Sequence, residues 1–366
     1  MTSADSYDEL DPATGAPLNQ ERISIRRARL RAETQRDALF GALELDGNTV
    51  DGATARLLAA QVGWHAAPSL TVTVGLFKTP FGVEVPAPER DKAFLEPPAF
   101  ARALFPGSYD AGVMVHGAYG LARYALAIVN GSPSGDAQWR GTDPSSSYDV
   151  VGRIGASVEG PRRFRIEAGV SGLRGTGLSP GTPPTKDDLQ WIDQNQDGQI
   201  QTTELVVVPG TPGTSSVTFE RQAIGADLAV HWCVCVIGTG TAFLELASAT
   251  NLDRGLVYAD PVRASRDLRH LGFSVGAVQA ITDHAVVGVR YDRYAADRDR
   301  IEQLGVTIVD QDQVFSTLSI MATGRWGEAR LVAQYDRERN PFGRADDGAV
   351  TTREADRFSL RAQVGF

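Results

Sequence analysis

The final twelve residues of the chain, Ala355 to Phe366, alternate between apolar and polar side chains. One face carries Phe358, Leu360, Ala362, Val364 and Phe366, and the other carries Arg357, Ser359, Arg361, Gln363 and Gly365. This period of two predicts a β-strand. A strand of about 9–11 residues spans a bilayer when it is tilted, and apolar and charged faces suit a wall between lipid and water. The alternative is an amphipathic edge strand of a soluble sheet.

Similar stretches recur along the chain about fifteen times, which predicts an all-β protein. Tight turns such as Asp283-His284 close pairs of strands, whereas long connections such as Asn251 to Arg269 join one pair to the next. Short turns at one end and long loops at the other are typical of outer-membrane barrels, and a Greek-key sandwich would not sort its connections so regularly. We therefore predict a transmembrane antiparallel β-barrel over residues 23–366, with about 15 strands of an expected 16.

Composition excludes two classes of protein. The hydrophobic fraction is 42% and no apolar run approaches the ~18 residues of a spanning helix, which excludes a helical membrane protein. The net charge of -9 argues against a nucleic-acid partner. The predicted partners are the lipid bilayer of the bacterial outer membrane and small anionic or polar solutes.

The N-terminal segment, residues 1–22, is polar and lacks the charged and apolar regions of a secretory leader. Bacterial single-chain barrels have an even number of strands, whereas fifteen would leave the first and last strands parallel. One hypothesis explains both observations: the leader and the first strand precede residue 1, and residues 1–22 form an extracellular loop. A soluble all-β binding protein is the alternative that the missing leader suggests.

Several motifs between Ile23 and Gly131 resemble one known family. They are Val74-Gly75-Leu76-Phe77-Lys78-Thr79-Pro80-Phe81-Gly82-Val83-Glu84, Arg26-Arg27-Ala28-Arg29-Leu30, Phe94-Leu95-Glu96, Leu104-Phe105-Pro106-Gly107, Asp110 to Gly117 and Tyr124 to Gly131. On these motifs the chain resembles the phosphate-selective porin O and P family. The resemblance implies a sixteen-stranded outer-membrane barrel, usually a homotrimer, with a constriction loop at residues 80–108 folded into the pore. The chain lacks the lysine cluster of the phosphate-selective members.

Basic residues on the polar faces of the strands and on the constriction loop are predicted to line the pore. The set is Arg27, Arg29, Arg31, Lys78, Arg90, Lys92, Arg102, Arg153, Arg163, Arg165, Arg290, Arg330 and Arg361, and Arg123 lies on the same wall. Rings of basic side chains are one means of anion selection, so we expect a passive porin with a mild preference for anions. The alternative is that these arginines only pair with carboxylates such as Glu44, Glu167 and Asp227 and hold the wall together.

One motif in the long irregular segment 172–216 matches the twelve-residue calcium loop. Its oxygen donors are Asp193, Asn195, Asp197, the carbonyl of Gln199, and Glu204 as the bidentate last ligand, and Gly198 stands at the sharp turn. We therefore predict one structural calcium ion, the only predicted cofactor, in an extracellular loop. The alternatives are a metal-free turn and, for the whole protein, a pore-blocked calcium-binding adhesion barrel whose loops bind partners.

Catalysis has little support in the sequence. The five histidines are scattered without metal-ligand spacing, and no nucleophile elbow or phosphate loop stands between a strand and a helix. We therefore expect the protein not to be an enzyme.

Overall fold

The computed structural model describes residues 25, 27–49, 53–142, 144–161, 164–234, 238–304, 307–310, 314–344 and 350–364. The predictions for residues 1–22, Arg163 and Phe366 lie outside these ranges. The described chain forms one antiparallel sheet of 15 strands, as predicted. In sheet order they are β1 (Ala28–Arg36), β2 (Leu39–Asn48), β3 (Thr54–Ala67), β4 (Leu70–Lys78), β5 (Tyr109–Tyr119), β6 (Ala122–Val129), β7 (Asp149–Glu159), β8 (Arg165–Ser179), β11 (Val217–Val234), β12 (Gly238–Thr250), β13 (Arg269–Ala280), β14 (Ala285–Ala295), β17 (Val314–Trp326), β18 (Ala329–Arg344) and β19 (Val350–Val364).

Each strand of this sheet pairs with the next one, and the connections alternate in length. Short turns join β1 to β2, β3 to β4, β5 to β6 and β13 to β14, whereas long segments follow β4, β6, β8, β12 and β14. The predicted separation into a short-turn end and a long-loop end is therefore confirmed. The long connections also hold two small sheets that the sequence pattern did not predict, β9 (Asp188–Trp191) with β10 (Leu205–Val208) and β15 (Ile301–Leu304) with β16 (Thr307–Asp310).

The outer face of the sheet is apolar. On β19, Phe358 and Leu360 are 49% and 62% exposed, whereas Arg357 on the opposite face is 5% exposed. Large aliphatic side chains such as Val170 and Ile320 are likewise exposed on other strands. An exposed apolar band that surrounds a more polar interior is what a lipid-facing wall requires.

Exposed aromatic side chains gather near the short turns. Trp64, Tyr119, Phe164 and Trp326 are all exposed, and each lies within a few residues of a short turn. Aromatic rings at one level of a barrel form the girdle at a membrane interface. This end of the barrel therefore carries one boundary of the apolar band.

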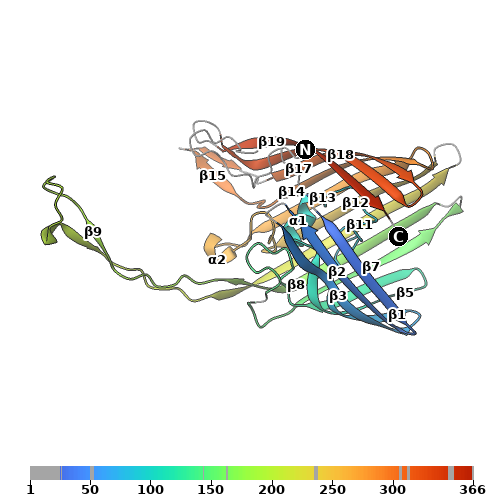
Figure 1. Ribbon diagram of the computed structural model, residues 1–366, viewed down its shortest axis with the longest axis horizontal. Helices are drawn as coiled ribbons and strands as arrows, with labels where there is room; N and C mark the ends of the chain where they lie inside the picture. The colour runs from blue at the N-terminus through green and yellow to red at the C-terminus, as the bar shows by residue number, and fades with distance from the viewer. Residues whose placement is uncertain are drawn as a thin grey trace.

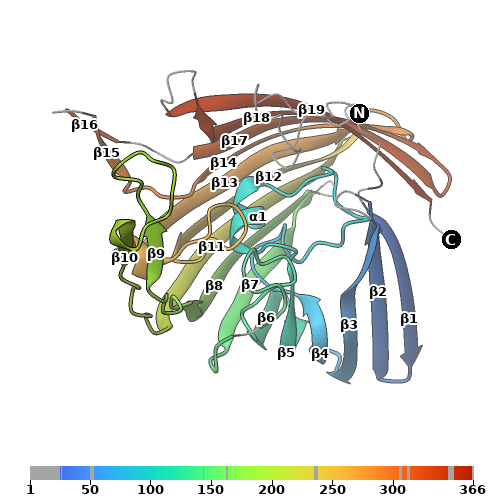
Figure 2. The same ribbon diagram turned by 60° about the vertical axis from the view of Figure 1, so that its left-hand side comes forward.

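The sheet curves round on itself, and Figure 2 shows β1 and β19 as the two ends of the curve. No ladder joins β1 to β19 among the described residues, and in an antiparallel sheet of 15 strands these two run in the same direction. The two edges nevertheless approach the same residue, because Arg27 beside β1 donates a hydrogen bond to the carboxylate of Glu89 and Arg361 on β19 donates one to its backbone carbonyl.

The structure extends β8 beyond its predicted end. The irregular segment was predicted to begin at Gly172, but the ladder with β11 continues to Ser179. Gly175 and Gly177 look like strand breakers, yet both lie where a Cβ atom would collide, with Asp149 and with Phe219 respectively. Residues 180–216, here called the arm, then leave the barrel, and Figure 1 shows the arm standing far out from its long-loop end.

Two short helices accompany the strands, α1 (Ala99–Leu104) and α2 (Pro261–Ala264). Neither of these, nor any other helix in the described ranges, has the length and apolar character needed to cross a membrane.

Candidate functional site

Residues 79–108, here called the inner segment, connect β4 to β5 and run inside the curve of the sheet, where Figure 2 shows α1. Wall side chains from strands far apart in the sheet accept hydrogen bonds from its backbone amides. Ser171 of β8 binds the amide of Gly82 at 3.0 Å, Asp292 of β14 that of Ala99 at 2.9 Å, and Gln334 of β18 that of Leu95 at 2.7 Å. The inner segment therefore crosses the interior rather than resting on the rim.

Towards the long-loop end, the inner segment packs into an apolar core. Phe81, Phe100, Leu104 and Phe105 are at most 2% exposed. They lie against inward-facing wall residues that are also apolar, namely Ala127, Val129, Val151, Leu173, Ala223 and Ala247. Fully burying each large side chain contributes roughly 1.5–3 kcal/mol. The alternation in the sequence had implied an inner face that is polar along its whole length. Part of that face is instead apolar, because it packs against the inner segment.

A tight turn begins the inner segment and depends on one wall carboxylate. Glu245 of β12 accepts hydrogen bonds from the amides of Val83 and Glu84, both at 3.1 Å. Gly82 adopts a positive φ of 64°, and a Cβ atom there would collide with the Glu245 carboxylate. Only glycine meets both requirements without strain. The wall residue Glu245 therefore determines that position 82 is glycine.

Glu89 is the electrostatic centre of the inner segment. Its carboxylate lies 2.9 Å from Lys92 Nζ, 3.1 Å from Arg27 Nη1 and 3.6 Å from Lys78 Nζ. Burial alone would raise the pKa of Glu89, but the positive charges of Lys92, Arg27 and Lys78 outweigh it and lower the pKa to about 2. The carboxylate therefore stays ionised at neutral pH and holds the inner segment to the start of β1.

Two arginines hold the same stretch from the last strands of the sheet. Arg330 of β18 donates to the carbonyls of Arg90 and Lys92, both at 3.2 Å. Arg361 of β19 donates to those of Glu89 and Lys92 at 3.2 and 3.1 Å. The inner segment is therefore fastened to both edges of the sheet.

A cavity of about 1150 Å³ lies between the inner segment and the walls of β1 to β8, and Gln363 and Val364 of β19 also line it. Its basic lining residues are Arg29, Arg31, Lys78, Arg90, Arg123 and Arg153, and its acidic ones are Glu44, Glu89 and Glu167. The lining is therefore basic by three formal charges. Small wall residues such as Ala118, Ala125 and Gly155 also line the cavity, and their size leaves the space open.

Five of the predicted pore residues line this cavity: Arg29, Arg31, Lys78, Arg90 and Arg153. The other described residues of the predicted set do not line it. Lys92 and Arg290 are buried, at 6% and 3% exposure. Lys92 pairs with Glu84 and Glu89. Arg290 lies over the ring of Phe94 and donates a hydrogen bond to the carbonyl of Glu96. A further group does not line the cavity either: Arg27, Arg330 and Arg361 hold the inner segment, Arg102 lies on α1, and Arg165 pairs with Glu167.

The arginines of the cavity wall differ in how far their charge is compensated. Arg153 makes a two-pronged ion pair with Asp227, at 2.9 Å from Nε and 2.5 Å from Nη2, and its guanidinium lies where a Cβ atom at Gly169 would be. Arg31 pairs with Glu44 at 3.0 Å. Arg123 faces the cavity from β6 and, among the described residues, has no carboxylate at ion-pair distance.

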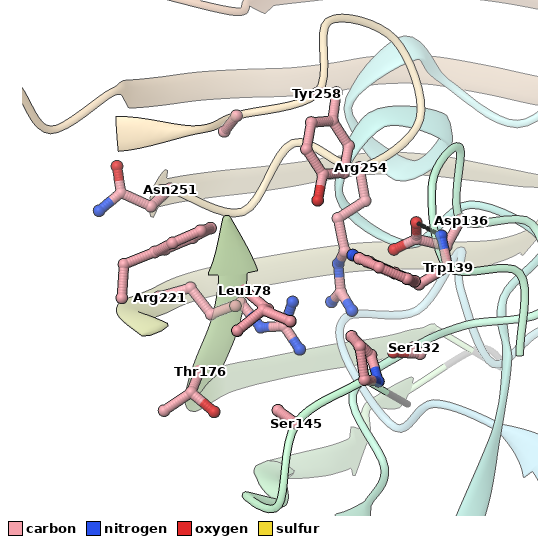
Figure 3. A pocket seen from close by; sticks show the side chains of 14 residues that line it. Ser132, Asp136, Trp139, Ser145, Thr176, Leu178, Arg221, Asn251, Arg254 and Tyr258 are labelled. Carbon is pink, nitrogen blue, oxygen red and sulfur yellow. Dashed lines mark hydrogen bonds between the residues drawn. The ribbon is translucent and has the colours of Figure 1, made fainter. Parts of the chain in front are cut away.

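A second polar cluster lies at the long-loop end (Figure 3). Arg221 of β11 lies 3.0 Å from Asp149, and both Arg221 and Arg254 donate to the carbonyl of Gly131. Burial and the charge of Arg221 lower the pKa of Arg254 to about 10, so this side chain stays protonated at neutral pH. The space between these groups is about 20 Å³, enough for roughly one water molecule. The cluster joins the loops after β6 and β12 to the wall and leaves no room for a solute.

The predicted calcium loop lies on the arm between β9 and β10. The Asp193 carboxylate accepts from the Gly198 amide at 3.0 Å, and the φ of Gly198 is 71°. Glu204 is 3% exposed, although it belongs to an exposed arm, and its carboxylate accepts from Trp191 Nε1 at 2.9 Å. The other oxygen of Asp193 is buried without a hydrogen-bond partner. Within the described ranges, no three His, Cys, Asp or Glu side chains converge closely enough to hold a metal ion.

No profile of a known protein family matches the sequence, and no curated protein sequence matches it either. Solved structures do resemble the fold. The outer membrane channel DcaP of Acinetobacter baumannii superposes with a TM-score of 0.56 at 11% identity, covering 100% of this chain and 92% of that one. The in-vitro folded outer membrane protein OmpT of Vibrio cholerae gives 0.50 at 11% identity, covering 92% and 88%.

A third similar structure is an anion-selective porin from Comamonas acidovorans, with a TM-score of 0.50 at 10% identity, covering 96% of this chain and 92% of that one. At these identities the likeness concerns the fold. The described chain has the fold of an outer-membrane antiparallel β-barrel, and the three structures above, described as a channel, an outer membrane protein and a porin, share it over most of their length.

Proposed function

We propose that this protein is a porin of the bacterial outer membrane that lets small hydrophilic solutes diffuse passively and favours anions mildly. The observation that carries the proposal is the cavity of about 1150 Å³ inside the barrel, whose charged lining comprises six basic and three acidic side chains. Basic side chains around a water-filled passage lower the energy of an anion relative to a cation.

The preference is mild because most of the basic charge is compensated locally. Arg29, Arg31 and Arg153 each lie beside a carboxylate of the wall, whereas Arg123 has no carboxylate at ion-pair distance in the part of the chain that the structure describes. A wall of paired charges attracts either ion weakly, so a few unpaired cations set the sign of the selectivity. The phosphate selectivity that the sequence resemblance implies has no comparable support, because among the described residues only one wall arginine that faces the cavity lacks a carboxylate at ion-pair distance.

The test is the reversal potential of the purified full chain in a planar bilayer under a KCl gradient. We expect open-channel steps with a reversal potential shifted towards that of chloride. Arg123→Glu should move it towards the potassium value, while Arg174→Glu, a matched change at an exposed arginine outside the cavity, should not. A channel that prefers potassium would contradict the anion preference. The absence of conductance would contradict the porin and favour a pore-blocked adhesion barrel.

We further propose that the arm binds one calcium ion, with Asp193, Asn195, Asp197, Gln199 and Glu204 as ligands. The support is the complete match to the loop pattern together with the buried, unpartnered oxygen of Asp193. Hard oxygen donors at this spacing suit calcium. A sheet of two four-residue strands is marginal on its own, so a bound ion would stiffen the arm.

Calorimetric titration of the full chain in detergent with calcium tests this second proposal. We expect one site that Glu204→Gln removes, and that Glu220→Gln, an exposed glutamate at the start of β11, leaves intact. No heat of binding up to about millimolar calcium, the weak end of the range for such loops, would refute the site.

A further inference from the structure

The cavity has two unlike faces. One is the inner segment, where Pro80, Val83, Pro86, Ala87 and Pro88 line the space. Val83 is 46% exposed and Pro88 is also exposed. Proline has no amide hydrogen, so Pro86 and Pro88 offer a solute no backbone donor. The carbonyl of Ala87 between them already accepts a hydrogen bond from Lys78. The stretch from Pro80 to Pro88 is therefore apolar towards a solute, whereas Glu89 and Arg90, which follow it and also line the cavity, are charged.

The other face is the wall of β5 to β8, where Arg123 and Arg153 stand among Ala118, Ala125 and Gly155. Small residues on both sides give a solute access to the guanidinium groups. Two nitrogen atoms of Arg153 already donate to Asp227. Arg123 is therefore the arginine of this wall whose guanidinium N–H groups can bind a solute. Among the residues that the structure describes, this wall thus presents one positive charge without a carboxylate at ion-pair distance, in the same cavity as an apolar surface.

These two faces fit different parts of one solute. A fully hydrated anion such as inorganic phosphate loses water on entering a confined space, and that loss is compensated only where several donors replace the water. The prolines of the apolar stretch, Pro80, Pro86 and Pro88, have no amide hydrogen to offer. A carboxylate with an apolar body needs donors at one end only, and its body gains from leaving water against the proline-rich face.

We propose that the cavity selects small organic monoanions, with the carboxylate on Arg123 and the apolar body against the Val83 and Pro86 to Pro88 surface. This inference rests on the proposed porin function and names its solute class. It differs from the phosphate preference that the sequence resemblance implies, because it requires apolar contact as well as charge.

Four probes separate the two requirements. Benzoate carries both charge and apolar body, benzamide has the body without the charge, acetate has the charge with almost no body, and inorganic phosphate has more charge and no body. Calorimetric titration into the full chain in detergent at pH 7 measures binding without reference to conduction. We expect benzoate to bind at least about tenfold more tightly than each of the other three.

Substitution of the assigned residue supplies the second arm. Arg123→Gln should weaken benzoate binding about tenfold or more, Arg123→Lys should restore part of it because charge is kept without the planar fork, and Arg174→Gln should bind like the wild type. The Arg123 variants should unfold at the same temperature as the wild type. A loss of benzoate binding then results from the changed site and not from a damaged fold. Phosphate or acetate binding as tightly as benzoate, or benzoate binding untouched by Arg123→Gln, overturns the inference.

Bilayer recordings separate failure of the solute class from failure of the porin function. Open channels in which benzoate reduces the chloride current and phosphate does not at equal concentration support both proposals. Open channels that phosphate blocks at least as well as benzoate overturn the solute class and leave the porin standing. Benzoate binding in a protein that never conducts overturns the porin and supports the binding site.

Discussion

Glu89 offers the sharpest test of how the inner segment is held in place. Its carboxylate is the shared partner of Lys92, Arg27 and Lys78, so Glu89→Gln removes one negative charge and leaves three cations close together. The backbone carbonyl of Glu89 still accepts from Arg361, and glutamine has nearly the same size. The substitution therefore changes charge while keeping packing almost constant.

The magnitude follows from the pKa. A folded-state pKa of about 2, set against an ordinary value of 4.5, corresponds to about 3 kcal/mol of favourable interaction of the carboxylate. Lys92 and Arg27 keep second partners in Glu84 and Glu96, which offset part of the loss. We expect Glu89→Gln to destabilise the fold by about 2–3 kcal/mol, which for a chain of this size lowers the midpoint of thermal unfolding by about 3–4 °C.

Thermal unfolding in detergent and single-channel recordings measure this effect, and Asp91→Asn is the matched control. Asp91 lies two residues away on the same segment, but its side chain is 63% exposed and its one ion pair within the described ranges is with exposed Arg90 at 3.7 Å. We expect the control to unfold like the wild type and to conduct quietly, whereas Glu89→Gln should show flickering current at pH 7 because the inner segment moves more freely.

The pH dependence has a definite sign. Because the pKa of Glu89 is depressed, its contribution is complete above about pH 4.5 and is lost as the pH falls towards 2. The wild type should therefore begin to flicker only in that acid range, and Glu89→Gln should not change further there. A Glu89→Gln variant that unfolds with the wild type and conducts quietly at pH 7 would refute the view that Glu89 holds the segment.

Two further substitutions test the wall itself. Gly169→Ala should push the guanidinium of Arg153 off Asp227 and lower stability by about 1–3 kcal/mol, measured by thermal unfolding, whereas Gly172→Ala, where an added Cβ meets only a backbone oxygen at 4.0 Å, should change little. Ile320→Arg, in the middle of the exposed face of β17, should reduce the free energy of folding into lipid vesicles by about 2–4 kcal/mol, measured by refolding from urea. Trp326→Arg, near the membrane boundary, should reduce it by only about 0–1 kcal/mol. Equal losses would contradict the depth assigned to these two residues.

Much of the fold could be predicted because the relevant pattern is local. In β19 the apolar residues point outward and the polar residues point to the interior. The alternation from Arg357 to Val364 therefore identifies both the strand and its two faces. The tight turns and long connections are equally visible along the sequence. The end of β8 was misjudged because the glycines that suggest a break are instead required by neighbouring side chains on β7 and β11.

The candidate site was less accessible because its contacts join residues far apart in the chain. Gln334 accepts from Leu95 across 239 positions, and Arg361 reaches Glu89 across 272. No period or spacing records such contacts. The apolar inner surface formed by Val129 and Val151 was also hidden, since a wall residue that packs against an inserted segment looks the same in sequence as one that faces lipid.

Arginine illustrates why selectivity cannot be inferred from the number of basic residues. Arg153, Arg361 and Arg123 all lie on inward faces of strands, yet the first is neutralised by Asp227, the second holds backbone carbonyls, and only the third faces open space without a carboxylate partner among the described residues. Since a paired charge acts weakly on a passing ion and an unpaired one acts strongly, the character of the cavity depends on which arginine lacks a partner. That is decided by strand register and by the path of the inner segment, neither of which a local pattern contains.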